Sequence, residues 1–321
     1  MKPGDYSLGV DLGGTKIAIG LVDHSGKMIR LERIPTSKKG PQVIVDDIIS
    51  TVKKVDNGDG KIVAAGVGMA GQISLESGIV HFAPNLGWGD FPLGDALTIG
   101  LKVPVRVLND VRAITWGEWL YGAGQGYNDF LCVFIGTGIG GGIISGGKIL
   151  TGSDNAAGEV GHITIDLKGS LCTCGNRGCF ETLSAGWAIA RRAQEMLVSD
   201  PAGGHGLLAL VGGKADEITA KHVFEACRSK VPVALKVVDE AKEGLIAGIA
   251  SLVNTFNPRR IILGGGVIQG NPELIGVVRQ GIVQRALKVA TESLEIVPAA
   301  LKENAGVIGA AAFATYALFR K

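Results

Sequence analysis

Short apolar runs broken by glycine turns recur along the chain and predict β-strands. Residues 6–29, YSLGVDLGGTKIAIGLVDHSGKMI, are rich in β-branched side chains and are interrupted at Gly-Gly and at HSG, which predicts strand, turn, strand. Residues 61–71 and 103–110 are apolar runs of the kind that form buried strands in α/β sheets. Residues 130–150, FLCVFIGTGIGGGIISGGKIL, repeat the N-terminal pattern. The repeat predicts a duplicated fold whose two β-rich halves face a cleft.

Apolar positions three and four residues apart predict helices between these strands. In residues 41–55, Val43, Ile44, Ile48 and Val52 fall on one side of a helix. Residues 200–214 are rich in glycine and proline and predict a surface loop. The last helix is alanine-rich and is expected to pack back onto the first domain. Further helices are predicted at residues 113–124, 187–197, 234–256 and 304–319.

Length and composition narrow the class of protein. A chain of 321 residues, 46% hydrophobic and 19% charged, is expected to fold as two soluble globular domains. The formal charge of +2 offers no basic surface for nucleic acid or an anionic membrane. No apolar run reaches the roughly 18 residues that a membrane span needs, and no cleavable signal opens the chain, so a cytoplasmic location is expected.

Three glycine clusters at strand ends predict a phosphate-binding site. In DLGGTK, Gly13 and Gly14 let backbone N–H groups point at an anion, Thr15 and Lys16 add donors, and Asp11 can hold Mg²⁺ through water. A plain hairpin turn would explain one Gly-Gly pair, but not three clusters. None fits the P-loop or the dinucleotide-binding fingerprint. The other two clusters are GTGIGGG at 136–142 and LGGGV at 263–267.

The tetrapeptide VLND ends a predicted strand with two polar side chains, Asn109 and Asp110. A carboxylate at a strand end can accept a proton from a hydroxyl within roughly 3 Å, which is the role of an aspartate in many phosphoryl transfers. Either residue could equally serve as the N-cap of the helix that follows. Spacing alone leaves both interpretations open.

Three of the five cysteines lie in one short segment behind a histidine, which predicts a metal site. An odd number of cysteines argues against a disulfide framework. Zn²⁺ prefers four nitrogen or sulfur ligands in a tetrahedron, and a closed set of four leaves no position for water, so the site is interpreted as structural. Glu159 and Glu181 flank the segment, where a metal would fix both carboxylates toward a polyhydroxy ligand. The predicted ligands are His162, Cys172, Cys174 and Cys179.

These motifs together resemble the ROK family of sugar kinases and repressors, within the actin-like ATPase superfamily. DLGGTK and GTGIGGG resemble its two phosphate loops, and PNLGW and VLND its sugar-loop and catalytic-base segments. GEVGHITIDLKGSLCTCGNRGCFE resembles its zinc-and-sugar segment and is the most specific motif. The resemblance runs from about residue 6 to the C-terminal helix.

The resemblance implies a two-domain α/β fold of the actin-like ATPase (ribonuclease H-like) type with a cleft between the domains. A small α/β domain is expected at 1–116, completed by the C-terminal helix at 304–321, and a larger one with the zinc segment at 117–303. By the same resemblance, Asp110 is the general base for the sugar 6-hydroxyl, and His162 has one ring nitrogen on zinc and the other toward the sugar. The implied sugar contacts are Gly71, Asn85, Asn109, Asp110, Glu159, His162 and Glu181, and the implied ATP contacts are Asp11, Gly13, Gly14, Thr15, Lys16, Gly136, Thr137, Gly138, Gly140, Gly265 and Gly266.

One departure from the family pattern follows the catalytic segment. The family usually continues with small residues and an asparagine, whereas this chain has Val111 and Arg112. An Arg112 pointing into the cleft could alter sugar preference or phosphate contacts. We expect it to point outward along the helix instead, with no effect on the site.

The function implied is that of an ATP-dependent hexose kinase, a phosphotransferase with an alcohol acceptor, most simply a glucokinase with ATP, Mg²⁺ and structural Zn²⁺. N-acetylmannosamine, N-acetylglucosamine, mannose, fructose and allose are alternative substrates, and polyphosphate is an alternative donor. A sugar-responsive repressor is disfavoured, because its DNA-binding segment would precede a phosphate loop that here begins at Asp11. The expected partners are the sugar and ATP, with no nucleic acid and no membrane, and the chain is expected to form a homodimer or a higher homo-oligomer.

Overall fold

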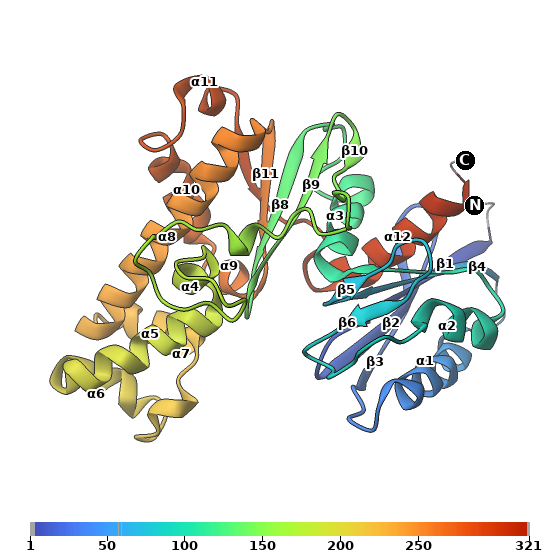
Figure 1. Cartoon of the computed structure of the whole chain (residues 1–321), viewed down its shortest axis with the longest axis horizontal. Coiled ribbons are helices and arrows are strands. Elements are labelled where there is room, and N and C mark those ends of the chain that lie inside the picture. Colours follow the sequence, from blue (N-terminus) through green and yellow to red (C-terminus); the bar gives the residue numbers. More distant parts are fainter. Residues whose placement is uncertain (1–3, 57, 59, 320–321) are drawn as a thin grey trace. The chain divides into compact units, whose positions relative to one another are not determined.

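The chain forms two compact units, which Figure 1 shows in the computed structural model. The structure describes residues 4–56, 58 and 60–319. Unit 1 consists of Met1–Tyr127, Ile149–Ala157 and Ala299–Lys321, and unit 2 of Asn128–Lys148 and Gly158–Pro298. None of the helices in the described part of the chain is both long and apolar enough to cross a bilayer.

Unit 1 is built on a five-stranded mixed sheet in the order β3-β2-β1-β4-β7. The first three strands form an antiparallel meander, and β4 and β7 extend it in parallel with β1. A two-stranded sheet, β5 (Gln72–Ile73) with β6 (Val80–Phe82), is added in the same unit. The main strands are β1 (Asp5–Leu12), β2 (Lys16–Val22), β3 (Met28–Pro35), β4 (Lys61–Met69) and β7 (Val105–Asn109).

Helices cover both faces of this sheet, and the alternation of side chains along β1 shows why. Leu8 and Val10 are fully buried in a core that they share with α1 (Pro41–Val55) and α2 (Leu93–Leu101). Gly9, between them, faces the other way, where a Cβ would lie 1.9 Å from the carbonyl oxygen of Val307. Val307 belongs to α12 (Ala305–Phe319), which packs on this second face together with α3 (Asp110–Tyr121). Small residues in the strands therefore let the C-terminal helix approach the sheet closely.

Unit 2 repeats the plan with a sheet in the order β10-β9-β8-β11-β12. Here β8 is antiparallel to β9 and parallel to β11, which in turn is parallel to β12. The long helix α8 (Pro232–Phe256) is central to the packing of the other helices. The strands are β8 (Phe130–Ile135), β9 (Ile139–Ser145), β10 (Lys148–Ile149), β11 (Arg260–Gly264) and β12 (Glu295–Pro298), and the other helices are α4 (Glu181–Ser184), α5 (Gly186–Ser199), α6 (Pro201–Ala209), α7 (Ala220–Arg228), α9 (Gly266–Gly270), α10 (Glu273–Ile282) and α11 (Lys288–Thr291).

The two sheets share one topology, in which an antiparallel hairpin comes first and two parallel strands are added beside it. This confirms the predicted α/β class, and the repeated sheet is the duplication that the two strand–turn–strand stretches indicate. The predicted helix at residues 41–55 coincides with α1, and the predicted C-terminal helix packs within unit 1 as α12.

The prediction of a surface loop at residues 200–214 is wrong for its first half, which is α6. Asp200 caps this helix by accepting a hydrogen bond from the Gly203 N–H at 2.9 Å, and Pro201 occupies its first turn. The glycines serve close packing, since a Cβ on Gly204 would lie 2.0 Å from Leu197. Capping and burial outweigh the weak helix propensity of this glycine-rich sequence.

The boundary expected at residue 116 falls inside α3, and unit 1 instead runs to Tyr127. A fully buried carboxylate on α3, that of Glu118, explains how neighbouring segments attach to this helix. It accepts hydrogen bonds from the N–H groups of Ala123, Ala300 and Leu301 at 2.7, 3.1 and 2.9 Å. The chain entering from residue 299 is therefore held on α3 together with the helix end.

Candidate active site and metal centre

The first glycine cluster forms the turn between β1 and β2 in unit 1. The N–H of Gly13 donates to the Lys16 carbonyl at 3.0 Å and closes the turn. The Thr36 hydroxyl donates to the Gly13 carbonyl, and the Lys38 ammonium to the Gly14 carbonyl, each at 2.7 Å. Both carbonyls are thereby occupied by donors, which reduces their repulsion of a nearby phosphate, while two lysines bring positive charge to the turn.

Lys38 was not singled out by the sequence pattern, and strand pairing explains its position. In the antiparallel pairing of β2 with β3, Lys16 lies opposite Pro35, so the residues after Pro35 return to the Gly-Gly turn. A register shift lies between Leu21 and Val22, near the hairpin turn at HSG. The turn alone would therefore not have fixed the position of the Lys38 segment.

Asp11 lies on the face of β1 that α12 covers. A Cβ added to Gly306, at the start of α12, would lie 2.7 Å from the Asp11 carboxylate. Burial raises the pKa of Asp11 above its ordinary value, and the charge of Lys16 partly opposes that rise. A partly desolvated carboxylate of this kind gains from a nearby cation, which suits a residue that holds hydrated Mg²⁺.

Asp11→Asn should raise the melting temperature of the ligand-free protein near neutral pH while lowering activity. The folded-state pKa of Asp11 lies above its unfolded value, so its contribution to stability is present below the unfolded pKa of about 3.9 and is lost as the pH rises through the folded pKa. Neutral asparagine has no such loss. Calorimetry across the acid range should show a difference between variant and wild type that appears only above about pH 4; a constant difference would contradict this.

The second and third glycine clusters lie at one edge of the unit 2 sheet, because β8 and β11 are parallel neighbours. Gly136 follows β8 and donates its N–H to the Gly138 carbonyl at 2.9 Å, and Gly265 follows β11. Gly265 has φ +87°, and a Cβ there would lie 2.4 Å from the Ile135 carbonyl oxygen, so only glycine fits. Added Cβ atoms on Gly136 and Gly266 would meet open space. Two predicted loops are thus adjacent.

Two other predicted ATP contacts, Thr137 and Gly140, have structural roles at the start of α5 and in β9. The Thr137 carbonyl accepts the Trp187 N–H at 3.2 Å and so holds the start of α5. Gly140 lies inside β9, paired with Phe134, and not in the turn itself.

Glu181 connects the cysteine segment to the second glycine cluster, a contact that the sequence did not reveal. Its carboxylate is 7% exposed and accepts the Ile139 N–H at 2.8 Å through Oε2. A Cβ on Gly138 would lie 2.5 Å from the same oxygen. Movement of the cysteine segment would therefore displace the glycine turn directly.

The structure distinguishes the two polar residues at the end of β7. The Asn109 side-chain oxygen accepts the N–H groups of Val111 and Arg112 at 3.0 and 3.2 Å, so Asn109 is the N-cap of α3. Asp110 is the first residue of the helix, and its Oδ1 accepts the Val111 N–H at 2.9 Å. The partial positive charge of a helix N-terminus favours the ionised form of a carboxylate there, which is the form that can accept a proton.

Gly71 and Asn85 lie in unit 1, and Asn85 is next to the first glycine turn. A Cβ on Gly14 would lie 3.3 Å from the Asn85 carbonyl oxygen. Gly71 has φ +151°, and a Cβ there would lie 2.5 Å from the carbonyl oxygen of Phe82, a few residues before Asn85. The segment 82–85 therefore joins both predicted sugar contacts to the phosphate turn.

The four predicted metal ligands come together in unit 2, with all ligand atoms within 4.8 Å of one another. Cys174 Sγ lies 3.7 Å from Cys179 Sγ, and Cys172 Sγ lies 3.7 Å from His162 Nδ1. A tetrahedron with Zn–S arms of about 2.3 Å has edges of about 3.8 Å, so these separations fit a four-coordinate zinc site. Because Nδ1 faces the cysteines, Nε2 lies on the opposite edge of the imidazole ring.

Hydrogen bonds within the cysteine segment hold the backbone in the conformation that brings the four predicted ligands together. The Cys172 N–H donates to the Asn176 carbonyl at 2.7 Å, and the Asn176 side-chain amide donates to Thr164 Oγ1 at 2.9 Å. Cys172 and Cys179 are buried, whereas Cys174 is exposed.

The thiols of the cluster differ in acidity in the protein without metal. Burial raises the pKa of Cys179 to about 12, and its two cysteine neighbours add to the rise. The backbone N–H of Asn176, above all, holds the pKa of Cys174 below its ordinary value. Cys179 therefore retains its proton at neutral pH, and binding of a divalent cation by its sulfur would release that proton.

Glu159 directly precedes the short 3-10 helix η1 (Val160–His162), and its side chain is exposed. The His162 N–H donates to the Glu159 carbonyl at 3.1 Å, which fixes the two residues on one turn. The predicted site residues are divided between the two units. Unit 1 holds Asp11, Gly13, Gly14, Thr15, Lys16, Gly71, Asn85, Asn109 and Asp110, and unit 2 holds Gly136, Thr137, Gly138, Gly140, Glu159, His162, Cys172, Cys174, Cys179, Glu181, Gly265 and Gly266.

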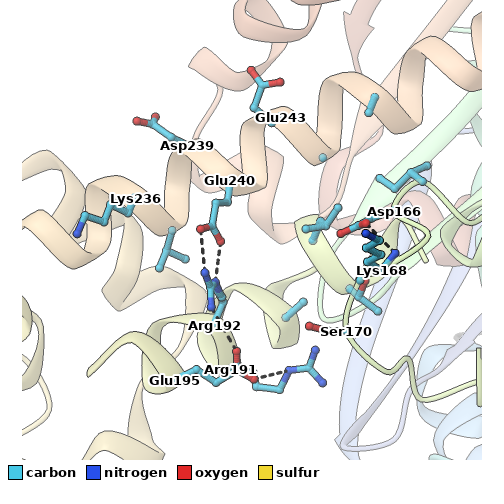
Figure 2. Close-up of a pocket in the computed structure, with 18 of the residues that line it drawn as sticks. Asp166, Lys168, Ser170, Arg191, Arg192, Glu195, Lys236, Asp239, Glu240 and Glu243 are labelled. Atoms are coloured by element: carbon cyan, nitrogen blue, oxygen red, sulfur yellow. Dashed lines mark hydrogen bonds and ion pairs between the residues drawn. The ribbon is translucent and has the colours of Figure 1, made fainter. Parts of the chain in front are cut away.

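A groove of about 840 Å³ in unit 2 lies beside residues 166–170 of the cysteine segment and contains none of these residues (Figure 2). Several of its charged side chains pair with one another. Arg192 binds Glu240 through two nitrogens at 2.7 and 3.0 Å, and Arg191 lies 3.5 Å from Glu195. The dashed lines in Figure 2 show that the Arg192–Glu240 pair joins α5 to α8, whereas the Arg191–Glu195 pair lies along α5.

Comparison with known proteins decides the family. The ROK family model matches residues 7–317, nearly the whole chain. The chain belongs to the ROK family. The predicted resemblance is thereby confirmed.

This ROK chain is similar to proteins named as glucokinases and a hexokinase. It is 37% identical to the glucokinase of Streptomyces coelicolor over 306 residues, which covers 95% of this chain and 96% of the relative. The crystal structure of a ROK family glucokinase from Streptomyces griseus, in complex with glucose and AMPPNP, is 36% identical and superposes with a TM-score of 0.83, covering 97% of this chain and 99% of that one. The ROK hexokinase of Thermus thermophilus is 30% identical with a TM-score of 0.84, covering 98% and 99%. The expected fold of the ROK sugar kinases is confirmed.

Proposed function

We propose that the chain is an ATP-dependent glucokinase that transfers the γ-phosphoryl group of ATP to the 6-hydroxyl of glucose. The observation that carries this proposal is the likeness to the Streptomyces griseus glucokinase that holds glucose and AMPPNP, an analogue of ATP, at 36% identity over 97% of this chain. The motifs for phosphate, base and sugar are all present in the sequence of the chain.

Asp110 is proposed as the general base. Its carboxylate lies in the first turn of α3, where the helix N-terminus attracts negative charge, and the cap made by Asn109 fixes the helix start. A carboxylate within hydrogen-bond distance of a hydroxyl can remove its proton during attack on the γ-phosphorus. Because the cap uses the oxygen of Asn109, its amide NH₂ is the group suited to a sugar oxygen.

The glycine turns and two lysines are proposed to bind the phosphates. Phosphoryl transfer depends mainly on positioning and on charge stabilisation, which backbone N–H groups and ammonium groups provide. Mg²⁺ would neutralise phosphate charge, and Asp11 is the residue proposed to hold it through water. The proposed ATP contacts are Asp11, Gly13, Gly14, Thr15, Lys16, Lys38, Gly136, Thr137, Gly138, Gly140, Gly265 and Gly266.

The cysteine cluster is proposed to hold a structural zinc ion, which would cross-link the segment and supply no reacting group. His162 Nδ1, on the side of the thiols, is the proposed ligand atom, which leaves Nε2 for a sugar hydroxyl. Glu159 and Glu181 flank the same segment and are proposed to bind further hydroxyls, together with Gly71 and Asn85. Homo-oligomerisation stays a prediction, which light scattering on the purified protein would test.

The test is a panel of hexoses and N-acetylhexosamines with ATP or polyphosphate and coupled detection of ADP or of the phosphorylated sugar. Glucose with ATP should give the highest kcat/KM. A broader hexokinase is the second candidate, favoured by the likeness to the Thermus thermophilus ROK hexokinase. Comparable kcat/KM for several hexoses would support that candidate, and activity only with an N-acetylhexosamine would contradict the glucokinase proposal.

Lys38→Met should raise the KM for ATP about fivefold and leave the KM for glucose unchanged, because an exposed charge contact is worth up to about 1 kcal/mol. The contact of Lys38 with the first glycine turn motivates this expectation. Lys39→Met is the matched control, since Lys39 is an equally exposed neighbour. Equal effects of the two substitutions would indicate general electrostatics and exclude a specific phosphate contact.

A further inference from the structure

Arg112 is a buried cation two residues after the proposed base. Its side chain is 3% exposed, contrary to the expectation that it points outward along the helix. Its guanidinium donates to the Asn155 side-chain oxygen, to the Asn155 carbonyl at 2.7 Å and to the Ala157 carbonyl at 2.9 Å. Hydrogen bonds from a charged donor are about twice as strong as neutral ones, and burial protects them from water.

The three acceptor atoms belong to one turn of unit 1, which residues 151–157 form. Asn155 has φ +55°, the left-handed conformation that asparagine tolerates, and its amide donates to the Ile73 carbonyl at 2.8 Å. The Ala157 N–H donates to the Thr151 carbonyl at 2.9 Å and closes the turn. Arg112 and Ile73 therefore hold this turn against the rest of the unit.

The position of the turn in the chain links it to the proposed sugar site. Ala157 is the last residue of its segment in unit 1, and Glu159 and His162 follow within five residues. The bond from Arg112 to the Ala157 carbonyl therefore fixes the backbone two residues before the first proposed sugar contact of that segment. The other end of the same side chain is attached to α3, whose first residue is Asp110.

We propose that Arg112 is a positioning residue for sugar binding: it fixes the 155–157 turn to the helix that begins with Asp110 and so restrains the backbone that leads into Glu159 and His162. This rests on the proposed function. A guanidinium suits the task because its planar fork reaches three acceptors at once, whereas the lysine ammonium is a compact charge that cannot reproduce this pattern. Arg112, which departs from the family pattern, would thus have a role in positioning the sugar.

Arg112→Lys and Asn155→Gly test the proposal from the two sides of the contact, and glycine retains the left-handed backbone at residue 155. Each should raise the KM for glucose by roughly tenfold or more, because small displacements of binding groups are costly, with the KM for ATP nearly unchanged. The double variant should be little worse than either single one, since both remove one interaction. Arg279→Lys is the control, a more exposed arginine in unit 2 that binds the Ile296 carbonyl at 3.0 and 2.6 Å.

Hydrogen exchange at residues 151–160 provides a readout that does not depend on activity. Exchange there should be faster in Arg112→Lys than in wild type and unchanged in Arg279→Lys. Unchanged exchange in Arg112→Lys would contradict the proposed positioning role. An equal rise in the KM for glucose and the KM for ATP, or no rise in either, would contradict it as well. A wild-type protein that phosphorylates no hexose would refute the proposed function, while exchange would still decide whether Arg112 fixes the turn.

Discussion

Asp110→Asn should lower kcat by a factor of about 10² to 10⁴, because removal of the attacking hydroxyl's proton is worth roughly that much. Asparagine matches aspartate in size and can still accept the Val111 N–H, so α3 should start at the same residue. The KM for glucose should change little, since most sugar contacts remain. Steady-state kinetics with ADP detection measure the effect, together with circular dichroism and metal analysis to show an intact fold.

The matched control for this substitution is Asp95→Asn, which changes an exposed aspartate in the first turn of α2. It removes the same charge from a comparable helix position and should leave kcat unchanged. Near-normal kcat in Asp110→Asn would show that the base lies elsewhere and that Asp110 serves only the start of α3.

Cys172→Ser should lose bound metal and sugar affinity together. The wild-type protein, purified without added metal, should contain about one zinc per chain, as the four-ligand geometry requires. Losing one thiolate opens the tetrahedron, and the segment that holds His162 and Glu181 loses its cross-link. Elemental analysis and isothermal titration with glucose measure the two effects.

Cys227→Ser is the control for the zinc prediction, because Cys227 lies on α7 outside the cluster. It should keep both metal and glucose affinity. The contact from Glu181 to the second glycine turn adds a further expectation, that nucleotide affinity also falls in Cys172→Ser. A metal-free wild-type protein with full activity and stability would contradict a structural zinc site.

The parts of the fold that follow local patterns could be predicted from the sequence. The helix at 41–55 shows apolar spacing along a single face, and α1 has these same bounds. The cysteine segment could be recognised because four ligands of the right type lie within eighteen residues, so that chain connectivity alone brings them close. In both cases the information lies in neighbouring residues.

The parts that depend on contacts between distant residues could not be predicted. From the sequence, Arg112 is expected on the surface of a helix. Its burial depends on Asn155, which lies 43 positions later and accepts its hydrogen bond. Lys38 reaches the first glycine turn only through the register of two strands. The α6 helix contains glycines at the positions that face Leu197 and Val231, because a side chain would not fit there. Tertiary packing decides such cases, and propensity does not.

The most direct test of the glucokinase assignment is identification of the product. Purified wild-type protein would be incubated with glucose, ATP and Mg²⁺ beside Asp110→Asn, and the sugar product would be identified by phosphorus and carbon NMR. The expected result is glucose 6-phosphate and ADP in equal amounts from wild type, with formation slowed by about 10² or more in the variant. No glucose-dependent release of ADP, or a phosphate found on another hydroxyl, would contradict the assignment.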